Sequence, residues 1–75
     1  MRLDKYLKVT RLIKRRTVAN DACDKEHVAV NGKVARASYE VKEGDTIAIR
    51  YAAKTVTVKV TDASDRNAAF EAVPT

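Results

Sequence analysis

The sequence is poor in the residues that mark secreted, membrane-bound and disordered proteins. It has one cysteine, Cys23, so an internal disulfide is impossible and nothing indicates an oxidising compartment. Only two glycines and one proline occur, which argues against a disordered linker. No apolar run approaches the roughly 20 residues that span a bilayer, and the basic N-terminus lacks the unbroken apolar stretch of a secretory signal. These absences predict a small folded cytoplasmic protein.

Aromatic residues and candidate catalytic groups are also few. There are three Tyr, one Phe and no Trp, and this scarcity favours structured RNA over single strands, whose bases usually stack on several aromatics. Cys23 and His27 are four residues apart, but each is the only residue of its type, and a structural zinc site needs four ligands. A catalytic nucleophile and base would also have to use His27 alone. We therefore expect no metal, no cofactor and no enzymatic activity.

Positive charge is concentrated at the N-terminal end. Residues 1–16 contain seven Lys or Arg and a single acid, Asp4, a net charge of +6, whereas the whole chain carries +5. The remainder therefore sums to about −1, and the cationic field is local. A local field of this kind on a small domain points to a polyanionic partner, with nucleic acid first among the candidates.

Two short helices are predicted at this end. Plotted on a helical wheel, residues 3–13 place Leu3, Tyr6, Leu7, Val9, Thr10 and Ile13 on one apolar face, with the cations opposite. Asp4 and Lys8 form a favourable i,i+4 pair. Leu12 disagrees with the wheel, so this helix should bend or end near Thr10 to Ile13. A second helix over residues 18–26 should begin at Thr17 as its N-cap and pack through Val18, Ala19, Ala22 and Cys23.

Alternating apolar residues predict strands in the rest of the chain. Val28 and Val30 precede Asn31-Gly32, the strongest short signal for a type I′ hairpin, and Val34 follows it. Residues 35–41 should form a loop and 43–45 a turn, and two further strands are expected over 46–51 and 54–61. The fold class is therefore α+β, with two short helices on a small, mostly antiparallel, four-stranded twisted sheet. Residues 1–61 should form this domain and 62–75 a polar C-terminal tail, whose abrupt ending leaves open a longer natural chain.

Several runs together resemble a known RNA-binding family. The stretches RLDKYLKVTRLIKRRT, VAVNGKV and VKEGDTI resemble the alpha-L RNA-binding domain of ribosomal protein S4, over about residues 1–61. The N-terminal run is most similar to the RqcP family of ribosome-associated quality control and to the related fifteen-kilodalton heat-shock proteins. This resemblance implies binding to large-subunit ribosomal RNA and adjacent tRNA, in support of alanine tailing of stalled nascent chains by an RqcH-type factor. We expect the chain to be a monomer.

The candidate RNA-binding residues come from the charge pattern, the predicted helix start and the resemblance. By resemblance, Arg2, Arg15 and Arg16 contact RNA, Asp4 orients the basic side chains, and Asn31 and Lys33 present the hairpin. The remaining candidates are Lys5, Lys8, Arg11 and Thr17. The apolar period fades before the Arg15-Arg16 doublet, so neither arginine should be needed for the core. The family usually has Gly before the first strand where this chain has Glu26-His27, so the second helix should close differently here.

Two alternatives remain open at this stage. The domain also occurs as an RNA-targeting part of pseudouridine synthases, so the chain could belong to a larger RNA-modifying enzyme. A basic amphipathic helix can also bind a membrane surface, although here its apolar face has a sheet to cover.

Overall fold

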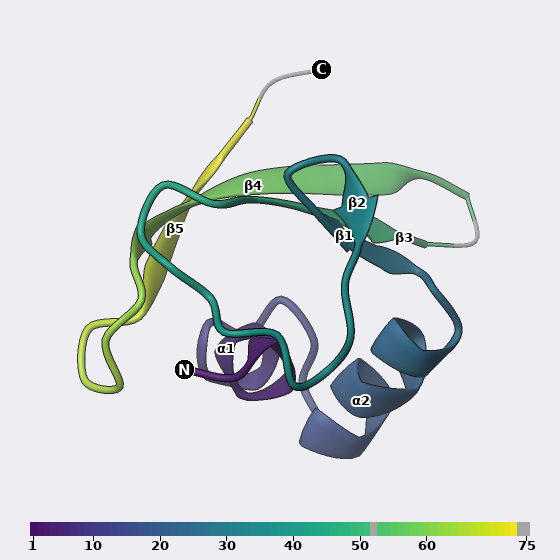
Figure 1. Ribbon diagram of the computed structural model, residues 1–75, viewed down its shortest axis with the longest axis horizontal. Helices are drawn as coiled ribbons and strands as arrows, with labels where there is room; N and C mark the ends of the chain where they lie inside the picture. Colours follow the sequence, from purple (N-terminus) through teal and green to yellow (C-terminus); the bar gives the residue numbers. More distant parts are fainter. Residues whose placement is uncertain (52, 74–75) are drawn as a thin grey trace.

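The computed structural model describes residues 1–51 and 53–73. Two helices, α1 (Leu3–Val9) and α2 (Arg16–Asp24), lie on one side of an antiparallel sheet. The strands of the sheet are β1 (Val28–Val30), β2 (Lys33–Val34), β3 (Thr46–Arg50), β4 (Thr55–Asp62) and β5 (Ala69–Ala72). The long connection between β2 and β3 passes over α1 (Figure 1). The predicted α+β class is confirmed, but the sheet has five strands in place of four, in the order β2-β1-β3-β4-β5. Within the described ranges, neither helix has the length and apolar content that a membrane crossing requires.

Helix α1 (Leu3–Val9) ends where the sequence predicted an irregularity. The hydroxyl of Thr10 donates to the carbonyl of Tyr6 at 2.7 Å, and Arg11 then turns into the left-handed region with φ 63°. Val9, at the edge of the predicted apolar face, is exposed, whereas Ile13 is buried from the turn beyond the helix. The continuous amphipathic wheel was therefore right for Leu3, Tyr6 and Leu7 and wrong for Val9.

Helix α2 (Arg16–Asp24) begins earlier than predicted. Its N-cap is Arg15, in an extended conformation and without a side-chain cap, so the prediction of Thr17 as N-cap is wrong. Thr17 lies inside the first turn, because the extended backbone of Arg15 and the anchored side chain of Arg16 set the start of the helix. Ala19 and Cys23 are buried as predicted, but Val18 is 51% exposed, against the prediction.

The end of α2 closes in a Schellman arrangement. The N–H of His27 donates to the carbonyl of Ala22 at 2.9 Å, and that of Glu26 donates to the carbonyl of Cys23 at 3.0 Å. Glu26 has φ 62°, the left-handed conformation that glycine usually supplies at this position. The expectation of a different closure is therefore wrong: the usual geometry is kept, and a side-chain-bearing residue is strained in it.

The Asn31-Gly32 turn joins β1 and β2 as predicted. Val30 pairs with Lys33, and the two turn residues have φ values of 53° and 83°, the positive pair that a type I′ turn requires. Strand β1 then pairs with β3, and β3 pairs with β4 over five residue pairs.

Strand β5 lies in the segment that the sequence pattern treated as a polar tail. It pairs antiparallel with β4, with an irregular register between Val60 and Asp62. The phenol of Tyr6 donates to the carbonyl of Ala69, which ties the start of β5 to α1. Burial, with a smaller effect of the Asp62 charge, raises the pKa of Tyr6 to about 12. The sheet therefore continues past residue 61.

The hydrophobic core lies between the two helices and the sheet. The helices contribute side chains that are at most 3% exposed. The strands β1, β3 and β4 contribute alternate residues, whose side chains point from one face of the sheet into the core. These residues are Leu3, Tyr6, Leu7, Ala19, Cys23, Val28, Val30, Ile47, Ile49, Val58 and Val60. Because the apolar face of α1 is buried here, it is not available to a membrane surface.

Candidate nucleic-acid interface

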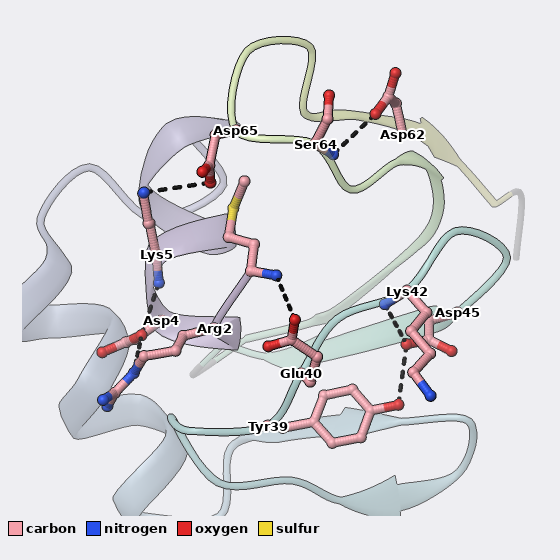
Figure 2. Close-up of polar contacts among 11 residues, drawn as sticks. Arg2, Asp4, Lys5, Tyr39, Glu40, Lys42, Asp45, Asp62, Ser64 and Asp65 are labelled. Atoms are coloured by element: carbon pink, nitrogen blue, oxygen red, sulfur yellow. Dashed lines mark hydrogen bonds and ion pairs between the residues drawn. The ribbon is translucent and has the colours of Figure 1, made fainter.

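The basic N-terminal region is organised around one buried acid, Asp4. Its side chain is 3% exposed, and Arg2 and Arg16 approach it from the two ends of the basic run. The Nε atom of Arg2 lies 3.3 Å from Oδ1, and the Nε atom of Arg16 lies 3.3 Å from Oδ2. Figure 2 shows the side chain of Arg2 directed at Asp4. We call Arg2, Asp4 and Arg16 the arginine clamp.

Further donors complete the shell of Asp4. The backbone N–H of Lys5 donates to Oδ1 at 2.8 Å, and the amide of Asn20 donates to Oδ2 at 3.4 Å. Burial alone would raise the pKa of Asp4, but hydrogen bonds from Arg16, Asn20 and the Lys5 N–H, with the Arg16 charge, outweigh it and lower the pKa below its ordinary value. Asp4 is thus a charged anchor at neutral pH. The predicted Asp4–Lys8 pair is wrong, because this carboxylate points into the helix–helix junction, and its ion pairs within the described residues are with the two arginines.

The clamp leaves the outer ends of both guanidinium groups available. The side chains of Arg2 and Arg16 are 51% and 50% exposed, and within residues 1–51 and 53–73 both use Nε for their hydrogen bond to Asp4. A guanidinium whose Nε is held by a carboxylate has a fixed plane, and its terminal N–H groups can meet phosphate oxygens in pairs. Asp4, Arg16, Thr17 and Asn20 line a shallow hollow of ≈ 360 Å³ at this point.

We predicted that neither Arg15 nor Arg16 is needed for the core, and the structure shows that the two residues differ. Arg15 is exposed and so lies outside the core, as predicted, and within the described part of the chain it takes part in no ion pair. Arg16 joins α2 to α1 through Asp4, so it has a structural role in addition to its exposed cationic end. Sequence spacing could not reveal this, since the two residues are twelve positions apart.

The connection between β2 and β3 brings a cation that the sequence analysis did not select. The N–H of Leu3 donates to the carbonyl of Tyr39 at 2.8 Å, and that of Asp4 donates to the carbonyl of Ala37 at 3.2 Å. These bonds place the exposed Arg36 near the start of α1. Arg36 and Lys33 line a second hollow of ≈ 660 Å³ beside the hairpin. The available signal was the K-x-x-R spacing directly after the Asn-Gly turn.

The hairpin residue Asn31 has an internal role. Its amide nitrogen donates to Asp45 at 3.1 Å, and its side-chain oxygen accepts from the N–H of Thr46 at 3.0 Å. Tyr39 and the Lys42 N–H also donate to Asp45, at 2.9 and 3.0 Å (Figure 2). Burial would raise the pKa of Asp45, but these hydrogen bonds and the Lys42 charge lower it. Asn31 thus fixes the hairpin that carries Lys33.

The remaining candidates differ in their surroundings. Lys8 and Arg11 are exposed, and Arg11 occupies the left-handed turn after α1. The Nζ atom of Lys5 lies 3.3 Å from Oδ1 of Asp65 in the β4–β5 loop, and this exposed ion pair is visible in Figure 2. Thr17 lines the hollow of the arginine clamp. The structure thus brings Arg2, Asp4, Arg16 and Thr17 together, and it ties Lys5 to a different part of the fold.

The lone cysteine and histidine have different surroundings: Cys23 is buried and His27 is exposed. Burial is the main cause that raises the pKa of Cys23 to about 11, so its thiol is protonated in the core. Across the part of the chain that the structure describes, no group of three or more His, Cys, Asp or Glu could hold a metal ion.

Comparisons with known proteins agree on one family. Residues 1–47 match the family model of the S4 domain. The "RQC P-site tRNA stabilizing factor" of Halalkalibacterium halodurans is 54% identical over 65 residues, 87% of this chain and 74% of that protein. The protein of the same name from Bacillus subtilis is 49% identical over 72 residues, 96% of this chain and 84% of that protein.

Solved structures show the same fold. The trimeric structure of Vibrio cholerae heat shock protein 15 has a TM-score of 0.86 at 29% identity, covering 97% of this chain and 81% of that one. The solution structure of a hypothetical protein has a TM-score of 0.78 at 32% identity, covering 100% of this chain and 99% of that one.

Proposed function

Since the chain belongs to the S4 domain family, and within it to the RQC P-site tRNA stabilizing factors, we propose that it is a non-enzymatic RNA-binding protein of ribosome-associated quality control. Its RNA targets are large-subunit ribosomal RNA and the adjacent tRNA, and a ribosomal partner of this kind implies a cytoplasmic site of action. Bound there, it supports alanine tailing of a stalled nascent chain by an RqcH-type factor. It acts as a monomer, which analytical ultracentrifugation tests.

The arginine clamp is the observation that carries this proposal. Two half-exposed guanidinium groups are held on one buried carboxylate, and their terminal N–H groups can bind two oxygens of a phosphate. Asp4 is charged at neutral pH, so the positions of Arg2 and Arg16 are set before RNA arrives. Because these long side chains are already ordered, RNA binding has a smaller cost in conformational entropy.

Further cations extend the contact around the clamp. Lys8, Arg11 and Arg15 are exposed near the two helices, and Lys33 and Arg36 line the hollow beside the hairpin. The N-terminal turn of α2 begins at Arg16 without a side-chain cap, so its backbone N–H groups add a favourable dipole for an anion. Backbone-directed cations with few aromatics suit a folded RNA recognised by its shape.

The experiment is sedimentation of purified large subunits with two charge-reversed variants. Arg15→Glu and Lys54→Glu each change the net charge from +5 to +3, and both residues are exposed. Lys54 directly precedes β4, and it lines neither the hollow at the arginine clamp nor the hollow beside the hairpin. We expect both variants to fold like the wild type by circular dichroism, and only Arg15→Glu to lose co-sedimentation.

If both variants co-sediment equally well with the large subunit, Arg15 is not part of the interface. Crosslinking of the tagged protein in cells, followed by sequencing of the attached RNA, identifies the target directly. We expect large-subunit ribosomal RNA and tRNA, and reads confined to messenger RNA would overturn the ribosomal assignment.

A further inference from the structure

A third hollow, of ≈ 440 Å³, lies between α2, the turn that follows α1, and the end of β3. Its wall is apolar and mostly aliphatic, formed by Leu12, Ile13, Val18, Ala22, Ile49 and Tyr51. Leu12 is the residue that disagreed with the helical wheel, and its place in this wall accounts for an apolar side chain on an otherwise basic face. We call this the α2–β3 hollow.

Two residues of this wall have large apolar side chains that are exposed to solvent. Val18 is 51% exposed and Tyr51 is 39% exposed. The Tyr51 hydroxyl donates to the carbonyl of Leu12 at 2.9 Å, so the ring is held against the turn. A hollow with a fixed aromatic wall and a neighbouring exposed valine offers apolar surface that a partner can bury.

The rim of the hollow is cationic. Lys14 and Arg50 line it, and both are exposed. Asp21 and Lys25 also line it, with Lys25 Nζ 3.1 Å from Asp21 Oδ2, so this pair adds no net charge to the rim. Within the described residues, Lys14 and Arg50 take part in no ion pair. The rim therefore complements an acidic partner.

The hollow and the arginine clamp lie on opposite sides of α2. Arg16 and Asn20, four residues apart, both contact Asp4. Val18 and Ala22 are each two residues further on, which at 100° per residue places them about 200° round the helix. One ligand can therefore occupy the hollow while another occupies the clamp.

We propose that the α2–β3 hollow binds an acidic protein segment that inserts one or two large apolar side chains, such as Leu or Phe, between Val18 and Tyr51. The volume suits side chains of this size, and the acidic flanks meet Lys14 and Arg50. A nucleobase is the weaker occupant, because the wall is aliphatic around a single tyrosine, whereas base-binding surfaces stack bases on several aromatics. The protein thus presents RNA-binding and protein-binding surfaces on the two flanks of one helix.

Nuclear magnetic resonance titration of the ¹⁵N-labelled chain tests this proposal. The probes are the acetylated, amidated peptide Glu-Asp-Leu-Phe-Glu-Asp, its Lys-for-acid counterpart, and a uridine hexanucleotide. We expect the acidic peptide to shift the amides of Val18, Ala22 and Tyr51 with a Kd of about 1 mM or tighter, the range of one buried anchor with charged flanks. The basic peptide should shift them at least about tenfold more weakly, because Lys14 and Arg50 repel it.

Two valine variants supply the matched control. Val18→Glu places a carboxylate in the wall of the hollow, and Val73→Glu makes the same change at an exposed valine after β5. Both should keep the wild-type spectrum elsewhere, and only Val18→Glu should abolish the peptide shifts. These spectra are recorded without RNA, so the result is independent of the RNA-binding proposal.

Three outcomes overturn the proposal. Shifts of these amides by the hexanucleotide and not by the acidic peptide would make the hollow a nucleotide site. Equal affinity for the acidic and the basic peptide would mean that Lys14 and Arg50 do not select an acidic segment. Absence of peptide shifts at the hollow, with the spectrum of the folded protein intact, would mean that the hollow has no affinity for such a segment.

Discussion

Arg16 and Asp4 connect the two helices, with Arg16 Nε 3.3 Å from Asp4 Oδ2 and the carboxylate almost fully buried. The same arginine keeps half of its side chain exposed, so one residue belongs both to the fold and to the proposed RNA contact. Stability and binding are therefore coupled at this position. A variant that changes only stability or only RNA binding must therefore be made at another residue.

Asp4→Asn should lower the free energy of unfolding by about 1.5–3 kcal/mol, because it removes the charge that two guanidinium groups share in a buried site. Urea unfolding at neutral pH measures this change. Asp21→Asn is the matched control, since it breaks the exposed Asp21–Lys25 pair and should cost less than about 1 kcal/mol. Equal losses in the two variants would contradict the buried-anchor role of Asp4.

The same variant has a defined pH dependence. The pKa of Asp4 is lower in the folded chain, so its stabilising contribution is fully present above the unfolded value and disappears as the pH falls through the folded value. The difference between wild type and Asp4→Asn should therefore shrink below about pH 4. A difference that stays constant down to the acid transition would mean that charge is not the cause.

Glu26→Gly should stabilise the chain by up to about 1 kcal/mol, because glycine adopts the left-handed conformation of this helix end without the penalty of a Cβ atom. Glu26→Ala removes the same carboxylate but keeps the Cβ atom, so it should give no comparable gain. Thermal and urea unfolding of both variants measure the effect. A Glu26→Gly protein less stable than Glu26→Ala would show that the strain lies elsewhere.

Gly32→Val should destabilise the hairpin by about 1–2 kcal/mol. A Cβ atom at Gly32 meets nothing within 4 Å, so the cost comes from the backbone angle of 83° and not from a clash. Gly32→Asn is the control, since asparagine tolerates the left-handed region better. The expected order of melting temperatures is wild type, then Asn, then Val, and an unchanged value for Val would mean that the turn type is wrong.

Arg11→Gly should change stability and RNA binding in opposite directions. Arg11 has φ 63° after α1, so glycine should stabilise the chain by up to about 1 kcal/mol while removing one exposed cation. Large-subunit affinity should fall although the fold is more stable. Unfolding and sedimentation on the same preparation decide this, and unchanged affinity would place Arg11 outside the interface.

The affinity for RNA should depend steeply on salt. If about five phosphates are neutralised, a plot of log K against log salt concentration should have a slope of about −3.5 to −4.5. Fluorescence anisotropy with a labelled large-subunit RNA fragment measures it. Arg15→Glu should give a shallower slope, and a wild-type slope near zero would indicate an apolar interface.

Local chemistry determined the elements that the sequence predicted well. The Asn31-Gly32 turn follows from two residues that accept positive φ, and the alternation around Ile47 and Ile49 follows from one buried sheet face. The end of α1 was also predictable, because Leu12 broke the apolar period.

Tertiary contacts determined what the sequence could not show. Asp4 looked like a solvated partner of Lys8, and its burial depends on Arg16 and Asn20 from another helix. The sequence of β5 has no clear alternation of apolar and polar residues, and the strand forms by pairing with the free edge of β4. Arg36 was missed because its position depends on how the long connection crosses α1.

The bond between Tyr6 and Ala69 spans 63 positions, which has a consequence for the order of folding during synthesis. A seven-residue helix such as α1 does not persist alone in water, so it needs the sheet to hold it. Contacts of high sequence separation form slowly, and the N-terminal part of a chain is synthesised first. The set of bonds that anchors α1 is therefore complete only after strand β5 has left the ribosome, because the Tyr6 phenol has no Ala69 carbonyl to bind before then.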